Sequence, residues 1–208
     1  MRITLTDAGK RFNRDWIFRH FNYQFNSSHA YAITGPNGSG KSTLLQFIAG
    51  ALMPSEGSLS CHDGEGRPLE DMYRHLSIVA PYLETIEEMT AREFLDFHHQ
   101  FKPLLPGLSP DQILSRTGLG GAAGKQIRYF SSGMKQRLKL AQAIFSNTEI
   151  LLMDEPTTNL DAPGTALYHE LVQEFAVNRM VIVSSNDPQE YSFCKNRIEM
   201  SSLKANNY

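Results

Sequence analysis

Residues 35–42 read GPNGSGKS and combine closely spaced glycines with a lysine and a serine. They fit the pattern G-x-x-x-x-G-K-[ST], and they lie between a short apolar run at 31–34 and a predicted helix at 41–50. Glycines let backbone N–H groups converge on a phosphate, and a helix N-terminus adds a favourable dipole. Lys41 would supply charge to the β- and γ-phosphates, and the Ser42 hydroxyl suits Mg²⁺. The pattern therefore predicts a nucleotide-binding phosphate loop; the alternative is a glycine-rich turn before an ordinary helix.

Two adjacent carboxylates end the apolar run ILLMDE at 150–155. Neighbouring acids at the end of a buried strand cost desolvation unless they have a purpose. We expect Asp154 to hold the Mg²⁺ shell and Glu155 to orient or deprotonate an attacking water. A solvated strand end before a turn at Pro156 is the alternative, and the phosphate loop weighs against it.

A third polar cluster follows the apolar run of VIVSSNDPQE at 181–190. The simplest interpretation is a strand that leads into a helix cap, because Ser, Asn and Asp are favoured caps. Pro188 would suit the first turn of that helix. The side chains of this cluster could also face a bound ligand.

Composition limits the class of protein. The chain has 208 residues, a formal net charge of −2 and no basic stripe, so we expect one domain with an added lobe and no nucleic-acid partner. Cys61 and Cys194 lack metal-ligand spacing and disulfide density, which favours a reducing compartment. No run approaches the ~18 apolar residues of a membrane span, and the first residues lack a signal-peptide pattern. The cytosol is the expected location.

The elements alternate in type along the chain. The first thirty residues predict antiparallel strands, and Thr90 with Glu93 predicts a capping box at the start of a helix whose face carries Phe94, Leu95 and Phe97. The last residues, SSLKANNY, are expected to be a loose end. Helices are predicted at 41–50, 90–101, 110–117, 132–145 and about 163–175, and further strands at 31–34, 57–60, 75–80, 149–153 and 180–184.

The order of these motifs resembles the nucleotide-binding subunits of ABC transporters over nearly the whole chain. The motifs are GPNGSGKST (35–43), FSSGMKQRLKLAQAI (130–144), ILLMDEP (150–156), TTNLD (157–161) and VIVSSND (181–187). The resemblance implies an α/β P-loop NTPase, an ABC-type ATPase with a RecA-like core, an N-terminal antiparallel β subdomain and an inserted α-helical subdomain. The single domain, 1–208, would divide into core and β subdomain at 1–83 and 147–208 and a helical subdomain at about 84–146.

The resemblance also implies roles for individual residues. Glu155, Lys41 and Asn186 would be catalytic, and Ser42 and Asp154 would bind Mg²⁺. Phe12 would stack on adenine, with Trp16 as a less favoured substitute, although either ring could instead belong to the core. ATP contacts would come from Phe12, Gly35, Pro36, Asn37, Gly38, Ser39, Gly40, Lys41, Ser42, Thr43, Ser131, Ser132, Gly133 and Asp161.

Three motifs depart from the family pattern. The signature Leu-Ser-Gly-Gly-Gln is replaced by Phe-Ser-Ser-Gly-Met at 130–134, and the Q-loop glutamine falls at Pro81 or Tyr82. Neither residue replaces the amide as a metal ligand. We favour a Q-loop that has lost its metal contact over one in which the Tyr82 hydroxyl reaches the metal through a water. Asn186 takes the place of the switch histidine, so it can hydrogen-bond to phosphate or water but cannot titrate near neutral pH.

The resemblance implies an ATP-binding and ATP-hydrolysing subunit of an ABC transporter, of the small type found in haem-exporter ATPases. It would form a head-to-tail homodimer, or a pair of nucleotide-binding domains, around two ATP with Mg²⁺, and would drive a separate transmembrane permease. It would then lie in the cytoplasm, peripheral on the inner membrane. A non-transport ABC ATPase acting as a mechanical clamp is the first alternative, and a small-molecule kinase that uses the same loop is a second.

Overall fold

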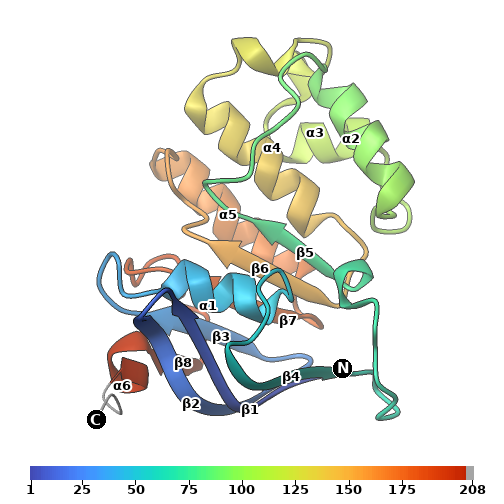
Figure 1. Ribbon diagram of the computed structural model, residues 1–208. Coiled ribbons are helices and arrows are strands. Elements are labelled where there is room, and N and C mark those ends of the chain that lie inside the picture. The colour runs from blue at the N-terminus through green and yellow to red at the C-terminus, as the bar shows by residue number, and fades with distance from the viewer. Residues whose placement is uncertain (205–208) are drawn as a thin grey trace. The chain divides into compact units, whose positions relative to one another are not determined.

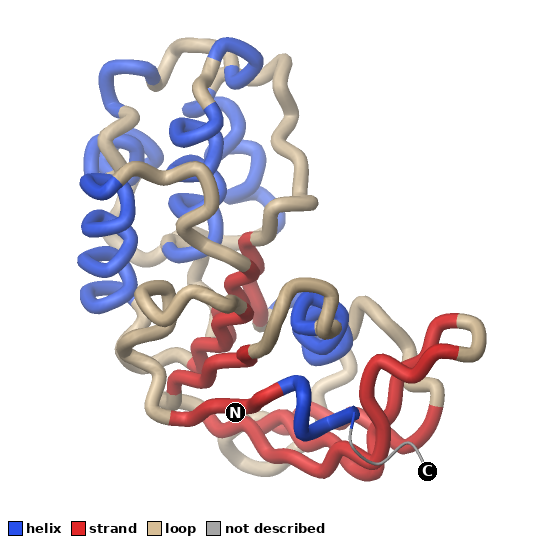
Figure 2. The backbone as a smooth tube through the Cα atoms, turned by 90° about the vertical axis from the view of Figure 1, so that its left-hand side faces the viewer, coloured by secondary structure: helices blue, strands red, loops and turns tan. Residues whose placement is uncertain are grey.

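The computed structural model describes residues 1–204, and the chain divides into two compact units. The first unit contains residues 1–76, 149–154 and 178 onward, and the second contains 77–148 and 155–177. Figure 1 shows strands with α1 in the first unit, and Figure 2 shows how helices dominate the second. No helix of the described residues is long and apolar enough to cross a bilayer.

The first unit contains the predicted antiparallel sheet. Its strands are β1 (Arg2–Phe12), β2 (Asp15–Asn26) and β4 (Glu56–His62), in the order β2-β1-β4. Alternate side chains on β1 and β2, such as Ile3, Leu5 and Phe18, are buried, as expected for a sheet with one covered face. This confirms the predicted N-terminal β subdomain.

The same unit contains a run of parallel strands in the order β6-β7-β3-β8. They are β3 (Ala30–Thr34), β6 (Ile150–Asp154), β7 (Met180–Ser184) and β8 (Asn196–Glu199). The helix α1 (Lys41–Ile48) packs on β3, β6 and β7, and its Phe47 ring lies 5.2 Å from that of Phe18 on β2. All residues of β6 and β7 are buried, which explains their continuous apolar runs.

The second unit is mainly helical. It contains α2 (Ala91–Phe101), α3 (Pro110–Arg116), α4 (Ser132–Ile144) and α5 (Ala162–Phe175), and the short strand β5 (Leu76–Val79) leads into it. The predicted capping box is present, because Thr90 Oγ1 accepts from the Glu93 N–H while the Glu93 carboxylate accepts from the Thr90 N–H. These helices confirm the predicted helical region within an α/β chain.

Two sequence predictions are wrong. Residues 188–193 form turns instead of a helix, since only a short segment separates β7 from the next strand. The segment after Ile198 is not a loose end, because β8 runs into α6 (Met200–Lys204); residues 205–208 lie outside the described part. Of the three residues predicted on one face of α2, Phe94 and Leu95 are buried, whereas Phe97 is 39% exposed and its ring lies 5.0 Å from that of Phe101.

Candidate functional site

The phosphate loop follows β3 and leads directly into α1. Gly35, Gly38 and Gly40 have φ values of 143°, 74° and 102°, which residues with a Cβ rarely adopt. A Cβ on Gly40 would also come within 2.2 Å of Ile17 Cγ2, so the loop needs glycine there for space as well. The Ser39 N–H donates to the Pro36 carbonyl at 3.1 Å, which closes a turn inside the loop.

Lys41 is the first residue of α1 and is only 5% exposed. Its Nζ donates to the Gly35 carbonyl at 3.0 Å and to the Pro36 carbonyl at 3.3 Å. The ammonium group is therefore folded back over the loop by the loop's own carbonyls. A buried cation held by neutral acceptors is well suited to an anionic partner such as a phosphate.

Asp154 and Ser184 end two neighbouring strands and are paired in the β6–β7 register. Asp154 is 2% exposed and Ser184 is fully buried. Within residues 1–204, Asp154 Oδ1 and Ser184 Oγ have no hydrogen-bond partner, and the buried Ser39 Oγ of the phosphate loop shares this property. A buried polar atom without a partner costs about 1–3 kcal/mol, so this end of the sheet needs a polar ligand. A carboxylate with hydroxyl groups suits Mg²⁺ and its waters.

The loop after β7 joins this site through Asn186. Its Nδ2 donates to Asn37 Oδ1 of the phosphate loop at 3.2 Å. The buried Ser185 Oγ accepts from the Asp187 N–H, and the Asp187 carboxylate accepts from the Gln189 N–H, each at 2.9 Å. The polar cluster thus forms tight turns and places an amide, not a titrating ring, against the phosphate loop.

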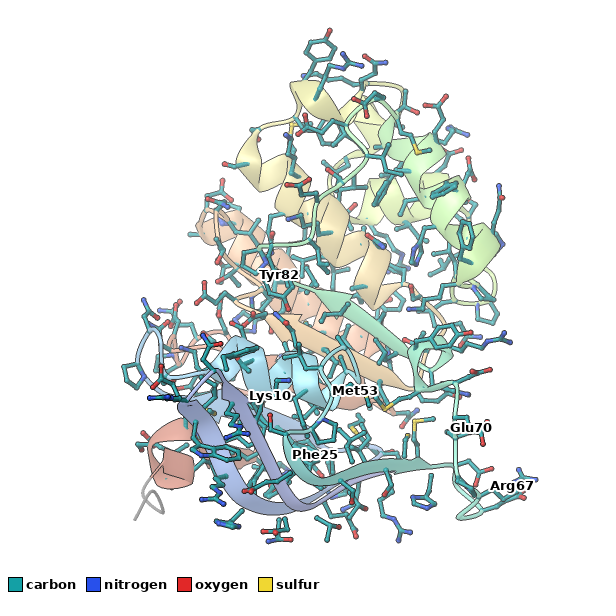
Figure 3. All side chains as sticks on the ribbon, in the orientation of Figure 1. Lys10, Phe25, Met53, Arg67, Glu70 and Tyr82 are labelled. Atoms are coloured by element: carbon teal, nitrogen blue, oxygen red, sulfur yellow. The ribbon has the colours of Figure 1, made fainter. Side chains whose placement is uncertain are left out.

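The two aromatic candidates for adenine differ in exposure. Phe12 ends β1 and is 46% exposed, and its ring contacts Lys10 Nζ at 5.3 Å from the centroid; Lys10 also donates to the Met53 carbonyl (Figure 3). Trp16 is instead covered by two guanidinium groups, with Arg19 at 4.6 Å and Arg11 at 5.4 Å from its ring. Phe12 is therefore the less covered of the two candidate rings, with one cation against it where Trp16 has two.

Glu155 directly follows Asp154 but belongs to the second unit. Its φ is 45°, a left-handed conformation that costs a residue with a Cβ on the order of 1 kcal/mol and is typical of functional sites. The Glu155 carbonyl accepts from the Thr158 N–H at 3.1 Å, so a tight turn holds the unusual backbone. At the end of this segment the Asp161 carboxylate caps α5 by accepting from the Gly164 N–H.

The signature residues begin α4 in the same unit. Ser131 is its N-cap and accepts from the Met134 N–H at 3.2 Å, and both Ser131 and Ser132 are exposed. A Cβ on Gly133 would lie 3.1 Å from the Asn159 carbonyl oxygen, a tight contact that glycine avoids. The two serine hydroxyls remain accessible at the start of a helix, where an anion is favoured.

The segment at the position of the Q-loop is tied to α4. Lys139 Nζ donates to the carbonyls of Ala80 at 3.5 Å and Pro81 at 3.2 Å, and burial lowers the pKa of Lys139. Further along the segment, Lys135 pairs with Glu87 and lowers the pKa of that carboxyl, mainly through the hydrogen bond. Tyr82 is 46% exposed (Figure 3).

The structure brings together, in the first unit, the phosphate loop with Ser42 and Thr43 in the first turn of α1, Asp154 and Asn186. Glu155, Ser131, Ser132, Gly133 and Asp161 belong to the second unit. The sequence analysis missed Ser184, although the expected parallel strands 149–153 and 180–184 could have indicated that its side chain ends beside Asp154. It also missed the contacts of Ile17 and Met200 with the loop, which no local pattern signals.

Comparison with known proteins places these features in a family. Residues 18–158 match the family model described as "ABC transporter". A cytochrome c biogenesis ATP-binding export protein, CcmA, of Rhizobium johnstonii is 32% identical over 83% of this chain and 82% of its own length. A lantibiotic transport ATP-binding protein, SrtF, of Streptococcus pyogenes is 30% identical over 88% of this chain and 79% of its own.

Solved structures agree on the fold. A Pyrococcus furiosus protein described as a putative ABC transporter ATP-binding protein superimposes with a TM-score of 0.81 at 18% identity, covering 98% of this chain and 99% of the other. A bacterial ABC transporter cassette, described as dimeric, gives 0.78 at 23% identity, covering 95% and 93%. The phosphate loop, the strand-end carboxylate and these matches together show that the chain belongs to the ABC transporter family, as one of its ATP-binding, ATP-hydrolysing subunits.

Proposed function

We propose that this chain is the ATPase subunit of an exporter-type ABC transporter that pairs head to tail around two ATP molecules and drives a separate membrane subunit. The observation that carries the proposal is the phosphate site, in which a buried Lys41 lies on a left-handed glycine loop and Asp154 Oδ1 is buried with no partner among the described residues. The ATP-binding export proteins among the relatives support the direction of transport.

Within one copy, each group has a distinct task. The loop N–H groups and Lys41 bind the β- and γ-phosphates, and Phe12 stacks on adenine. Ser42 and Asp154 would hold Mg²⁺, which when bound neutralises phosphate charge. Glu155 positions the attacking water or accepts its proton, and Asn186 contacts the γ-phosphate or that water without titrating.

The second half of the site is supplied by the partner copy. Ser131, Ser132 and Gly133 present hydroxyl groups and free N–H groups at the start of α4, and these suit a γ-phosphate that the same copy need not bind. Asp161 follows the turn that begins at Glu155, so it would contact the partner near the same phosphate. Hydrolysis would remove the shared phosphate and let the pair separate.

Replacing Glu155 by Gln tests the paired state. This variant keeps the phosphate loop but lacks a base, so hydrolysis should fall about 10²–10⁴-fold and ATP with Mg²⁺ should trap a dimer. Light scattering after size exclusion, with and without ATP, measures the mass. Glu170→Gln, which alters an exposed carboxylate on α5 in the same unit, is the matched control and should behave like the parent. A monomeric Glu155→Gln protein that hydrolyses ATP at the parent rate would contradict both roles.

The membrane subunit is tested by co-purification. A tagged chain extracted in mild detergent from membranes of its native host should retain a polytopic membrane protein. Recovery of only water-soluble partners would instead favour the clamp alternative. Transfer of phosphate to an added small-molecule acceptor, without phosphate release, would favour a kinase.

A further inference from the structure

Met200 lies beside the first glycine of the phosphate loop although 165 positions separate the two residues in the sequence. The parallel register of β3 and β8 pairs Thr34 with Glu199, so the chains leave the sheet side by side as Gly35 and Met200. Met200 begins α6 and is fully buried. Figure 1 shows α6 next to β2 and β8, and α6 packs on β2.

The Met200 side chain reaches both ends of the loop. A Cβ on Gly35 would lie 3.2 Å from Met200 Cβ, and a Cβ on Gly40 would lie 3.3 Å from Met200 Cε. Ile17 of β2 approaches Gly40 as well, since its Cγ2 would lie 2.2 Å from a Cβ there. Met200 and Ile17 therefore occupy the space into which a side chain at position 40 would project, and Met200 shares the space at position 35 with Ser39, whose Oγ would lie 2.9 Å from a Cβ there.

This packing limits the conformational freedom of the phosphate loop. Three glycines with positive φ give the loop its shape, but glycine also has the largest conformational freedom to lose. The N–H groups can bind phosphate well only if the loop already has its bound shape, because ordering a flexible loop on binding reduces affinity. Methionine fills irregular gaps well, and its thioether does not compete with the loop for hydrogen bonds.

We propose that Met200, together with Ile17, is a positioning residue that holds the phosphate loop in its nucleotide-binding shape. The inference rests on the proposed nucleotide site, but not on the dimer, the membrane subunit or the role of Glu155. Met200 acts through Gly35 and Gly40, and Ile17 acts through Gly40. The segment that begins at Met200 is thereby a functional part of the ATP site.

The test separates loop positioning from general core packing. Met200→Ala should raise the Kd for ATP about tenfold by calorimetry, at a temperature well below the unfolding midpoint, and Met200→Leu, which nearly conserves volume, should restore it. Met180→Ala is the matched control, because Met180 is also fully buried but begins β7, away from the strand end that carries Ser184. It should lower the midpoint similarly while leaving the Kd within about twofold of the parent.

A second pair of variants probes the same loop from β2. Ile17→Ala removes the Cγ2 atom that approaches Gly40 and should raise the Kd, whereas Ile17→Val keeps both γ-carbons and should not. If Met200→Ala fails to fold, the two Ile17 variants still test whether packing against the loop affects ATP affinity. The inference is overturned if Met200→Ala and Met180→Ala share the parent Kd, or if Ile17→Ala and Ile17→Val bind alike. A parent protein that does not bind ATP would instead refute the nucleotide site itself.

Discussion

The polar groups at the phosphate-loop end of the first unit and at the signature end of the second unit differ in burial and in hydrogen bonding. Lys41, Asp154 and Ser184 are buried, and in the described part of the chain Asp154 Oδ1 and Ser184 Oγ lack partners. Ser131 and Asp161 are exposed instead, and each accepts a hydrogen bond from the first turn of its own helix.

The difference separates two ways of building a site. The first unit carries buried polar groups that lack partners among the described residues, and such groups suit a polar ligand even in a single copy. The second unit presents ordinary helix caps, each satisfied locally, and these gain a binding role only when another surface supplies the phosphate. Substitutions that change one unit at a time test this difference.

The largest effect is expected on the buried side. Replacing Lys41 by Ala removes a charge with charge-assisted bonds to phosphate of about 1.5–3 kcal/mol, so ATP affinity should fall about 10–100-fold or more. Lys139→Ala is the matched control, because Lys139 also donates to two backbone carbonyls but in the second unit. The Lys139→Ala variant should bind ATP with the same affinity as the parent. Calorimetry checks both, and an undiminished affinity in Lys41→Ala would refute the phosphate cradle.

An intermediate effect is expected on the exposed side. Ser131→Ala should lower ATP hydrolysis about tenfold while a single copy still binds ATP, because in the proposed dimer the lost hydroxyl would face the partner's phosphate. Ser109→Ala removes an equivalent N-cap from α3 and controls for helix stability. Both variants should lose about 0.5–2 kcal/mol of folding free energy, measured in urea. Equal hydrolysis rates in Ser131→Ala and Ser109→Ala would show that Ser131 acts only as a helix cap.

The smallest effect is expected at Asn186. Replacing it by His restores the usual switch residue, so hydrolysis at pH 7.5 should stay within about twofold of the parent or rise. The parent rate should lack an acid limb caused by this position, whereas the variant should show one near the ordinary imidazole pKa of about 6.5. A pH–rate profile of both proteins measures this. A severe loss in the histidine variant would contradict the alignment of Asn186 with the switch.

Sequence reasoning succeeded where the determining contacts are local. The capping box of Thr90 and Glu93 joins residues three apart, and the phosphate loop is one continuous motif. It failed where the structure depends on residues far apart in the sequence. The strand β8 is only four residues long, and its pairing with β3 determines its conformation more than its own sequence does. Helical spacing placed Phe97 on one face with Phe94 and Leu95, but spacing cannot tell how far another element covers that face, and Phe97 is exposed.

The parallel run of β7, β3 and β8 also fixes when the ATP site can form. The phosphate loop leaves the ribosome before its neighbours Ser184, Asn186 and Met200, which follow it by more than a hundred positions in the sequence. Long-range pairing of this kind is slow, because chain entropy must be lost before the contacts can compensate. A nascent chain should therefore carry a complete glycine motif without nucleotide affinity until the segment through Met200 has emerged, so that ATP cannot bind before these strands have paired.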